Sequence, residues 1–173
     1  GVNVPGAELV LRVPDLAPDP DTRVIVNCAG RTRSLIGTQS LINAGLPNSV
    51  AALRNGTIGW VLAQQQLHFG RSCTFGDTPE ASVEQARRRA RAVADQAGVR
   101  RVEQGKLGDW ARQDGRTTYF FDVRDFAAYR KGHLPGFCPI PGGQLVQETE
   151  MYAPVRGARI VLVDDDGARA NMT

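Results

Sequence analysis

Cys28 is the residue whose type and surroundings could most plainly do chemistry. It follows three β-branched residues, Val24-Ile25-Val26, and a helical pattern of apolar residues begins about six residues after it. The first turn of a helix carries unpaired N–H groups and a partial positive charge. Together with the cations Arg31 and Arg33, such a helix start favours thiolate over thiol and can lower a cysteine pKa from about 8.5 to roughly 3.5–7.5. These residues therefore predict a nucleophilic thiolate at neutral pH.

A structural role for Cys28 stays open on these residues alone. An isolated cysteine at the end of a strand is commonly a small buried hydrophobic residue. That interpretation does not explain why two arginines lie within five residues of the thiol, at a turn from strand to helix.

With these residues the chain resembles the rhodanese family of sulfurtransferases, whose active loop is a cysteine plus five residues between a central strand and a helix. The resemblance covers about residues 1–70 and 106–173. The family typically has its aspartate strand and its Gly-His-x-Pro-Gly turn before the cysteine, whereas here they follow it. The matching segments are Cys28-Ala29-Gly30-Arg31-Thr32-Arg33, Leu53-Arg54-Asn55-Gly56 with Trp60, Asp122-Val123-Arg124 and Gly132-His133-Leu134-Pro135-Gly136.

The resemblance implies a reaction and a set of site residues. Cys28 would take a sulfane sulfur from an anionic donor such as thiosulfate and pass it, through a persulfide, to a thiol or to cyanide. The acceptor thiol is a small molecule or a protein, and no metal or organic cofactor is implied. His133 would serve its turn and not the chemistry. The substrate-binding residues would be Ala29, Gly30, Arg31, Thr32, Arg33 and Ser34.

Two rival functions stay open. Cysteine-dependent phosphatases and arsenate reductases use a similar loop, but with five residues between cysteine and arginine, whereas four separate Cys28 from Arg33. A rhodanese fold can also serve as a binding or regulatory module without catalysis.

Hydrophobic patterning predicts the elements that position Cys28. A short buried strand at 24–26, a helix from Ser34 to Asn43 and a strand at 50–53 form a βαβ unit of a parallel sheet. A second helix over 59–67 carries Trp60 as a core residue or pocket wall. A long alanine-faced helix, with Thr78 at its N-cap, ends at Gly98 and straddles two modules. Strands follow at 119–123 and 159–163.

An internal repeat relates the two ends of the chain. When each residue is paired with the one 136 positions later, eight of the 37 pairs from Gly1 to Gly37 are identical, where composition alone gives roughly two. This register pairs Cys28 with Asp164. Because a carboxylate cannot carry a sulfane sulfur, we expect the later module to be inactive. Residues 1–37 are called the N-terminal copy below, and residues 137–173 the C-terminal copy.

The predicted fold class is α/β, with a rhodanese-like parallel sheet flanked by helices and present as parts of two consecutive modules. Residues 1–70 would be the C-terminal half of a module with its active loop, residues 71–105 a helical connection, and residues 106–173 the N-terminal half of the next module. A start at Gly1 suggests a piece of a longer chain. Alternatively, residues 1–70 and 106–158 could pack as one permuted module that shares a single sheet.

The composition of the chain limits the classes of binding partner that we expect. The net charge is +3 and no apolar run is long enough to span a membrane. The Arg87-Arg88-Arg89 cluster suits a solvated helix face, so no nucleic-acid or membrane partner is expected. Cys28, Cys73 and Cys138 form no C-x-x-C motif, which argues against a metal site and predicts free thiols or core residues in a reducing compartment, the cytoplasm.

Overall fold

The computed structural model describes residues 1–70, 72–112 and 115–173. Its secondary structure alternates short helices with short strands, as an α/β fold does. In chain order the elements are η1 (Gly6–Glu8), α1 (Leu9–Leu16), β1 (Val24–Val26), α2 (Thr32–Asn43), β2 (Val50–Ala52), α3 (Gly56–Leu62), α4 (Glu80–Gln96), α5 (Gln104–Arg112), β3 (Thr118–Asp122), α6 (Phe126–Lys131), β4 (Cys138–Pro139), α7 (Gly142–Gln147), α8 (Thr149–Tyr152), β5 (Arg159–Val163) and α9 (Ala168–Met172).

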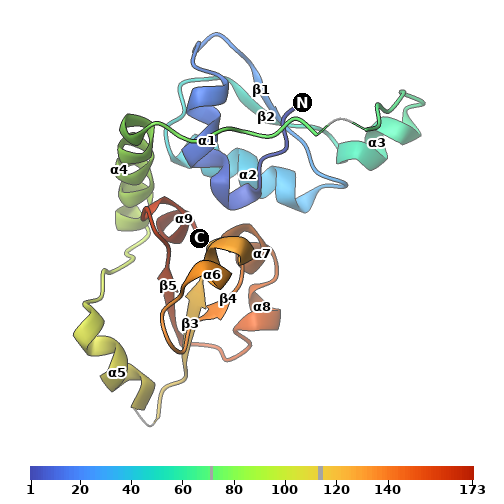
Figure 1. The fold of residues 1–173 in the computed structure, drawn as a ribbon. Helices are drawn as coiled ribbons and strands as arrows, with labels where there is room; N and C mark the ends of the chain where they lie inside the picture. Colours follow the sequence, from blue (N-terminus) through green and yellow to red (C-terminus); the bar gives the residue numbers. More distant parts are fainter. Residues whose placement is uncertain (71, 113–114) are drawn as a thin grey trace.

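The strands form two separate parallel sheets (Figure 1). β1 pairs with β2 in one sheet, and β3 lies between β4 and β5 in the other. The predicted α/β class, with parallel sheets flanked by helices, is confirmed. The alternative of one shared sheet is wrong, because in the described residues β1 pairs with β2 alone and the two form a sheet separate from that of β3, β4 and β5.

β1 is less buried than its composition predicts. Val26 is buried, but Ile25 is 51% exposed. Side chains alternate between the two faces of a strand, and α1 and α2 cover only the face that carries Val26. In the described part of the chain, β1 has one strand neighbour, β2, so a continuous β-branched run here does not indicate burial on both faces.

Two helices begin earlier than predicted. α2 begins at Thr32 and not at Ser34, because the Ser34 hydroxyl donates to the Arg31 carbonyl oxygen within the helical turn instead of capping it. α3 begins at Gly56 and ends at Leu62, where 59–67 was predicted. Trp60 is 41% exposed, so it is no core residue, and its indole N–H donates to the Gln66 carbonyl oxygen at 2.9 Å.

α4 straddles the two halves of the molecule, as its alanine face predicts (Figure 1). Ala86 and Ala90 pack in one buried cluster with Leu11 of α1 and Ala168 of α9. The helix ends before Gly98, which has a φ of +72°. The predicted Thr78 N-cap is wrong, since the N-cap residue is Pro79 and the Thr78 hydroxyl accepts a hydrogen bond from Arg12 instead.

In the C-terminal half, a buried ion pair fixes the end of β3. Asp122 is 1% exposed, and both its oxygens accept hydrogen bonds from the Arg124 guanidinium. The guanidinium also donates to Asp165 and to the Gly132 carbonyl oxygen. His133 is exposed, stacks on Tyr129 at 3.8 Å between ring centroids and bonds the Tyr129 carbonyl oxygen. These contacts tie His133 to the end of α6, which agrees with the predicted role in the turn.

Among the helices of the described residues, none is both long and apolar enough to cross a membrane.

Candidate active site

The loop from Asn27 to Arg31 joins β1 to α2 and places Cys28 at the N-terminal end of that helix. The Cys28 side chain is half-buried, and the nearby main-chain N–H groups of Ser34 and Gly30 favour its ionised form and lower its pKa. The Ser34 hydroxyl lies 3.5 Å from the sulfur and 2.9 Å from the Arg31 carbonyl oxygen. Its single hydrogen can therefore turn from the carbonyl to a thiolate when Cys28 ionises.

The groups around the sulfur set its pKa. Burial by itself raises the pKa of Cys28, because a charged form is poorly solvated inside the protein. Hydrogen bonds from the Ser34 hydroxyl and from the N–H groups of Ser34 and Gly30, together with the charge of Arg33, outweigh burial and lower the pKa below its ordinary value. The site therefore favours thiolate.

The first turn of α3 supports the conformation of the loop. The N–H groups of Thr57 and Ile58 donate to the carbonyl oxygens of Cys28 and Ala29, each at 2.9 Å. Gly56 has a φ of +57°, and a Cβ there would lie 2.3 Å from the Cys28 carbonyl oxygen. Only glycine fits a position with this backbone conformation and this close approach.

The two arginines of the loop face different hollows. Arg31 lines a cavity of about 440 Å³ together with Ser34, Arg54 and Asn55, beside the loop. Arg33 lines a separate cavity of about 510 Å³ between the N-terminal and C-terminal copies. The sequence grouped both arginines around one anion, whereas the structure places Arg31 with Arg54.

The sequence on both sides of the loop is basic. Between Asp21 and Asp77 the sequence contains no acidic residue, and its cations are Arg23, Arg31, Arg33, Arg54 and Arg71. A surface of one sign concentrates counter-ions and raises the rate at which they arrive. The cysteine-bearing half of the chain is therefore suited to an anionic substrate.

Of the other predicted site residues, Ala29 contributes its carbonyl oxygen to the support described above. Thr32 is exposed at the start of α2. Sequence reasoning missed Arg54 as part of the cavity and Gly56 and Thr57 as supports. The available signal was the Asn55-Gly56 pair, which indicates a tight turn but not what packs above it.

The C-terminal copy builds a similar loop around a carboxylate. Asp164 follows β5 as Cys28 follows β1, and it accepts bonds from the N–H groups of Gly167 and Ala170 at 2.9 and 3.2 Å. Ala170 is the partner of Ser34 in the 136-residue register. Burial raises the pKa of Asp164 to about 6, and the nearby Asp166 carboxylate adds to the rise.

Cys73 and Cys138 are both exposed and free, so neither is a core residue. No group of histidine, cysteine and acidic side chains that could hold a metal ion occurs within residues 1–70, 72–112 and 115–173.

Comparison with known proteins adds independent information. The model of the rhodanese-like domain matches residues 105–173. The crystal structure of a thiosulfate sulfurtransferase from Pseudomonas aeruginosa is similar to 99% of this chain, with 65% sequence identity and a TM-score of 0.96. The chain spans 33% of the length of that protein. No curated protein matches it.

The loop geometry, the parallel sheets flanked by helices and these two similarities agree with one another. The chain belongs to the rhodanese family.

Proposed function

We propose that the chain is the sulfur-carrying part of a sulfurtransferase and that Cys28 carries the sulfur. The observation behind this proposal is a sulfur at the start of α2 that contacts the Ser34 hydroxyl and whose pKa is lowered by Ser34, Gly30 and Arg33. The similarity to a thiosulfate sulfurtransferase supports the same reaction class.

The reaction has two balanced steps. The Cys28 thiolate attacks the outer sulfur of thiosulfate, the S–S bond of the donor breaks, and sulfite leaves with the bonding electrons. This step leaves Cys28 as an anionic persulfide. An acceptor thiolate, or cyanide, then attacks the outer sulfur of the persulfide and releases the Cys28 thiolate.

The residues of the loop have distinct proposed roles. The N–H groups of Gly30 and Ser34 stabilise negative charge on the sulfur in the manner of an oxyanion hole. Arg31, together with Arg54 in the adjoining cavity, binds the anionic donor through charge-assisted hydrogen bonds. Arg33 supports the thiolate through its charge, and Ala29 and Thr32 shape the loop.

We further propose that residues 1–70 are the latter half of one rhodanese module, that residues 71–105 connect it, and that residues 106–173 begin the next. β5 lies where the 136-residue register puts the counterpart of β1. The exposed face of β1 and β2 suits further strands or helices of a complete module. Three cysteines without a pairing motif fit a reducing compartment, and we place the protein in the cytoplasm.

A binding role is the second candidate, and Asp164 favours it for the C-terminal copy. A loop whose N–H groups already bond its own carboxylate has no thiolate and no vacant acceptor position for a sulfur. For the phosphatase alternative, Arg33 would need to face the anion held above Cys28, whereas it lines the cavity between the copies.

Intact mass spectrometry after incubation with thiosulfate tests the proposal. We expect Cys28 to gain one sulfur atom and to lose it again on addition of cyanide, while a Cys28→Ser variant gains nothing there. An unmodified Cys28 in both this chain and the longer protein would favour the binding role.

A further inference from the structure

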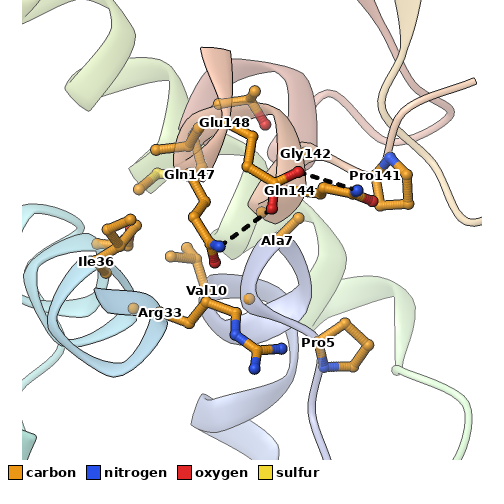
Figure 2. A pocket seen from close by; sticks show the side chains of 17 residues that line it. Pro5, Ala7, Val10, Arg33, Ile36, Pro141, Gly142, Gln144, Gln147 and Glu148 are labelled. Atoms are coloured by element: carbon orange, nitrogen blue, oxygen red, sulfur yellow. Dashed lines mark hydrogen bonds between the residues drawn. The ribbon is translucent and has the colours of Figure 1, made fainter. Parts of the chain in front are cut away.

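The cavity that Arg33 lines lies between the two copies (Figure 2). Its volume is about 510 Å³, within the range of small-molecule sites. η1, α1 and α2 form one wall, and α7 and the end of α9 form the other. Its apolar side chains include Val10, Ile36, Val146 and Met172, and its polar ones include Arg33, Gln144, Gln147 and Glu148.

The C-terminal copy contains a counterpart of Arg33 with which its surroundings can be compared. The 136-residue register pairs Arg33 with Arg169. Arg169 forms ion pairs with two carboxylates, those of Glu8 and Asp166. The same register replaces Glu8 by Gln144 and Asp166 by Gly30, so neither carboxylate has a counterpart beside Arg33.

Glu148 does not fill this vacancy. Its two oxygens accept hydrogen bonds from the side-chain amides of Gln144 and Gln147, at 3.3 and 3.2 Å (Figure 2). Among the described residues, no acidic side chain lies within ion-pair distance of Arg33. Arg33 is therefore a cation that faces a partly apolar cavity without a carboxylate to neutralise it.

We propose that the cavity between the copies binds a monocarboxylate with a short aliphatic chain. Its carboxylate pairs with Arg33, in the place that Glu8 takes against Arg169. Its chain lies against Val10, Ile36, Val146 and Met172. Apolar burial and a charge-assisted hydrogen bond then act together on one small molecule.

This site is coupled to Cys28 through Arg33. The charge of Arg33 lowers the pKa of Cys28, so a carboxylate that neutralises Arg33 raises that pKa and slows persulfide formation. The slowing rests on the proposed sulfur transfer, whereas the binding does not.

Isothermal titration calorimetry of the purified chain with hexanoate tests binding, with hexanol and hexylamine as controls of equal chain length. We expect hexanoate to bind in a one-to-one ratio and both controls to bind at least about tenfold more weakly, because each lacks the charge-assisted bond. Equal affinity for hexanol would show that the cavity binds apolar chains without Arg33. Tighter binding of hexylamine would show that Glu148 sets the preference, and either result overturns the proposal.

Two isosteric substitutions separate the contributions. Gln144→Glu adds a carboxylate to the cavity wall at the position that the register pairs with Glu8, so it should weaken hexanoate binding by repelling the ligand's carboxylate. Glu148→Gln removes the one acidic side chain of the cavity and should leave hexanoate binding equal or tighter. Unchanged binding in Gln144→Glu, with circular dichroism showing a folded protein, would contradict the proposal.

The two proposals fail separately. If hexanoate binds but Cys28 gains no sulfur, the proposed transferase function would be refuted and the proposed carboxylate site would stand. If Cys28 gains sulfur equally fast with and without hexanoate, and calorimetry detects no hexanoate binding, the proposed carboxylate site would be refuted. The proposed sulfur transfer would stand.

Discussion

At the scale of single residues, the decisive contacts are those around one sulfur atom. Burial opposes ionisation of Cys28, and the pKa is lowered only because several donors converge on it. The Ser34 side chain is the largest of these favourable contributions, and it is 1% exposed, so solvent does not weaken it.

Ser34→Ala should therefore raise the pKa of Cys28, since the thiolate loses its hydroxyl donor while burial remains. The pH dependence of iodoacetamide alkylation measures this shift, in a background in which the exposed Cys73 and Cys138 are serine. Ser40→Ala is a matched control, because Ser40 lies in the same helix and its hydroxyl bonds the Ile36 carbonyl oxygen. An equal effect in both variants would mean that helix stability, and not the hydroxyl contact, sets the pKa.

Asp164 gives a second prediction at this scale. Its pKa of about 6 in the folded protein lies above the usual value of about 3.9 for an unfolded chain. The folded state then binds more protons between these values, so stability falls as the pH rises from about 4 to 6, by roughly 2 kcal/mol in total.

Urea unfolding at several pH values measures that slope, and Asp164→Asn should flatten it. If the variant keeps the full slope, the titrating group lies elsewhere.

At the scale of elements, the first turn of α3 and the reactive loop form one unit. Gly56 combines a φ of +57° with an approach that leaves no room for a Cβ between two carbonyl oxygens of the loop. The loop conformation therefore depends on a residue that carries no chemistry.

Gly56→Ala should distort the loop and destabilise the chain by about 1–3 kcal/mol through backbone strain and overpacking. Cys28 should also lose part of its lowered pKa, because the Gly30 N–H moves with the Gly30 carbonyl. Gly45→Ala is the control: Gly45 has a φ of +68°, but a Cβ there meets nothing within 4 Å. It should show the strain cost alone, with the alkylation profile of Cys28 unchanged.

The elements also show what a sequence can and cannot predict. The strand, loop and helix around Cys28 follow from β-branched residues and apolar spacing, and the alanine face of α4 predicts a thinly packed helix that straddles two modules. The exposure of Ile25 could not be predicted, because it depends on which strands and helices cover the sheet. Arg31 and Arg33 point apart because side chains two residues apart on a helix do not face each other. The cavity beside Arg33 could not be predicted, because α7, which forms part of it, lies more than 100 residues away in the sequence.

At the scale of the whole molecule, a buried network of charges joins the two copies. Glu8 is 6% exposed and lies between two guanidinium groups, those of Arg12 and Arg169. Arg12 continues the network by stacking over the Phe75 ring at 4.3 Å. The loop that replaces cysteine by Asp164 thus contributes, through Arg169, to holding the N-terminal copy in place.

Glu8→Gln should destabilise the chain by about 3 kcal/mol, because the part-buried Arg12 loses its carboxylate partner and Arg169 keeps only Asp166. Chemical denaturation measures the loss. Asp109→Asn, in an exposed pair with Arg112, should change stability by less than about 1 kcal/mol. A loss in Glu8→Gln no larger than in this control would show that the network does not join the copies.

Sulfur transfer by this loop requires Cys28 to be ionised, and a titration of the thiol measures that ionisation. The absorbance of the thiolate near 240 nm, followed against pH in the chain with Cys73 and Cys138 replaced by serine, reports the pKa of Cys28 alone. We predict a midpoint clearly below the value of about 8.5 for a free cysteine. A midpoint at or above that value would contradict the claim that main-chain amides, Ser34 and Arg33 keep this sulfur ionised.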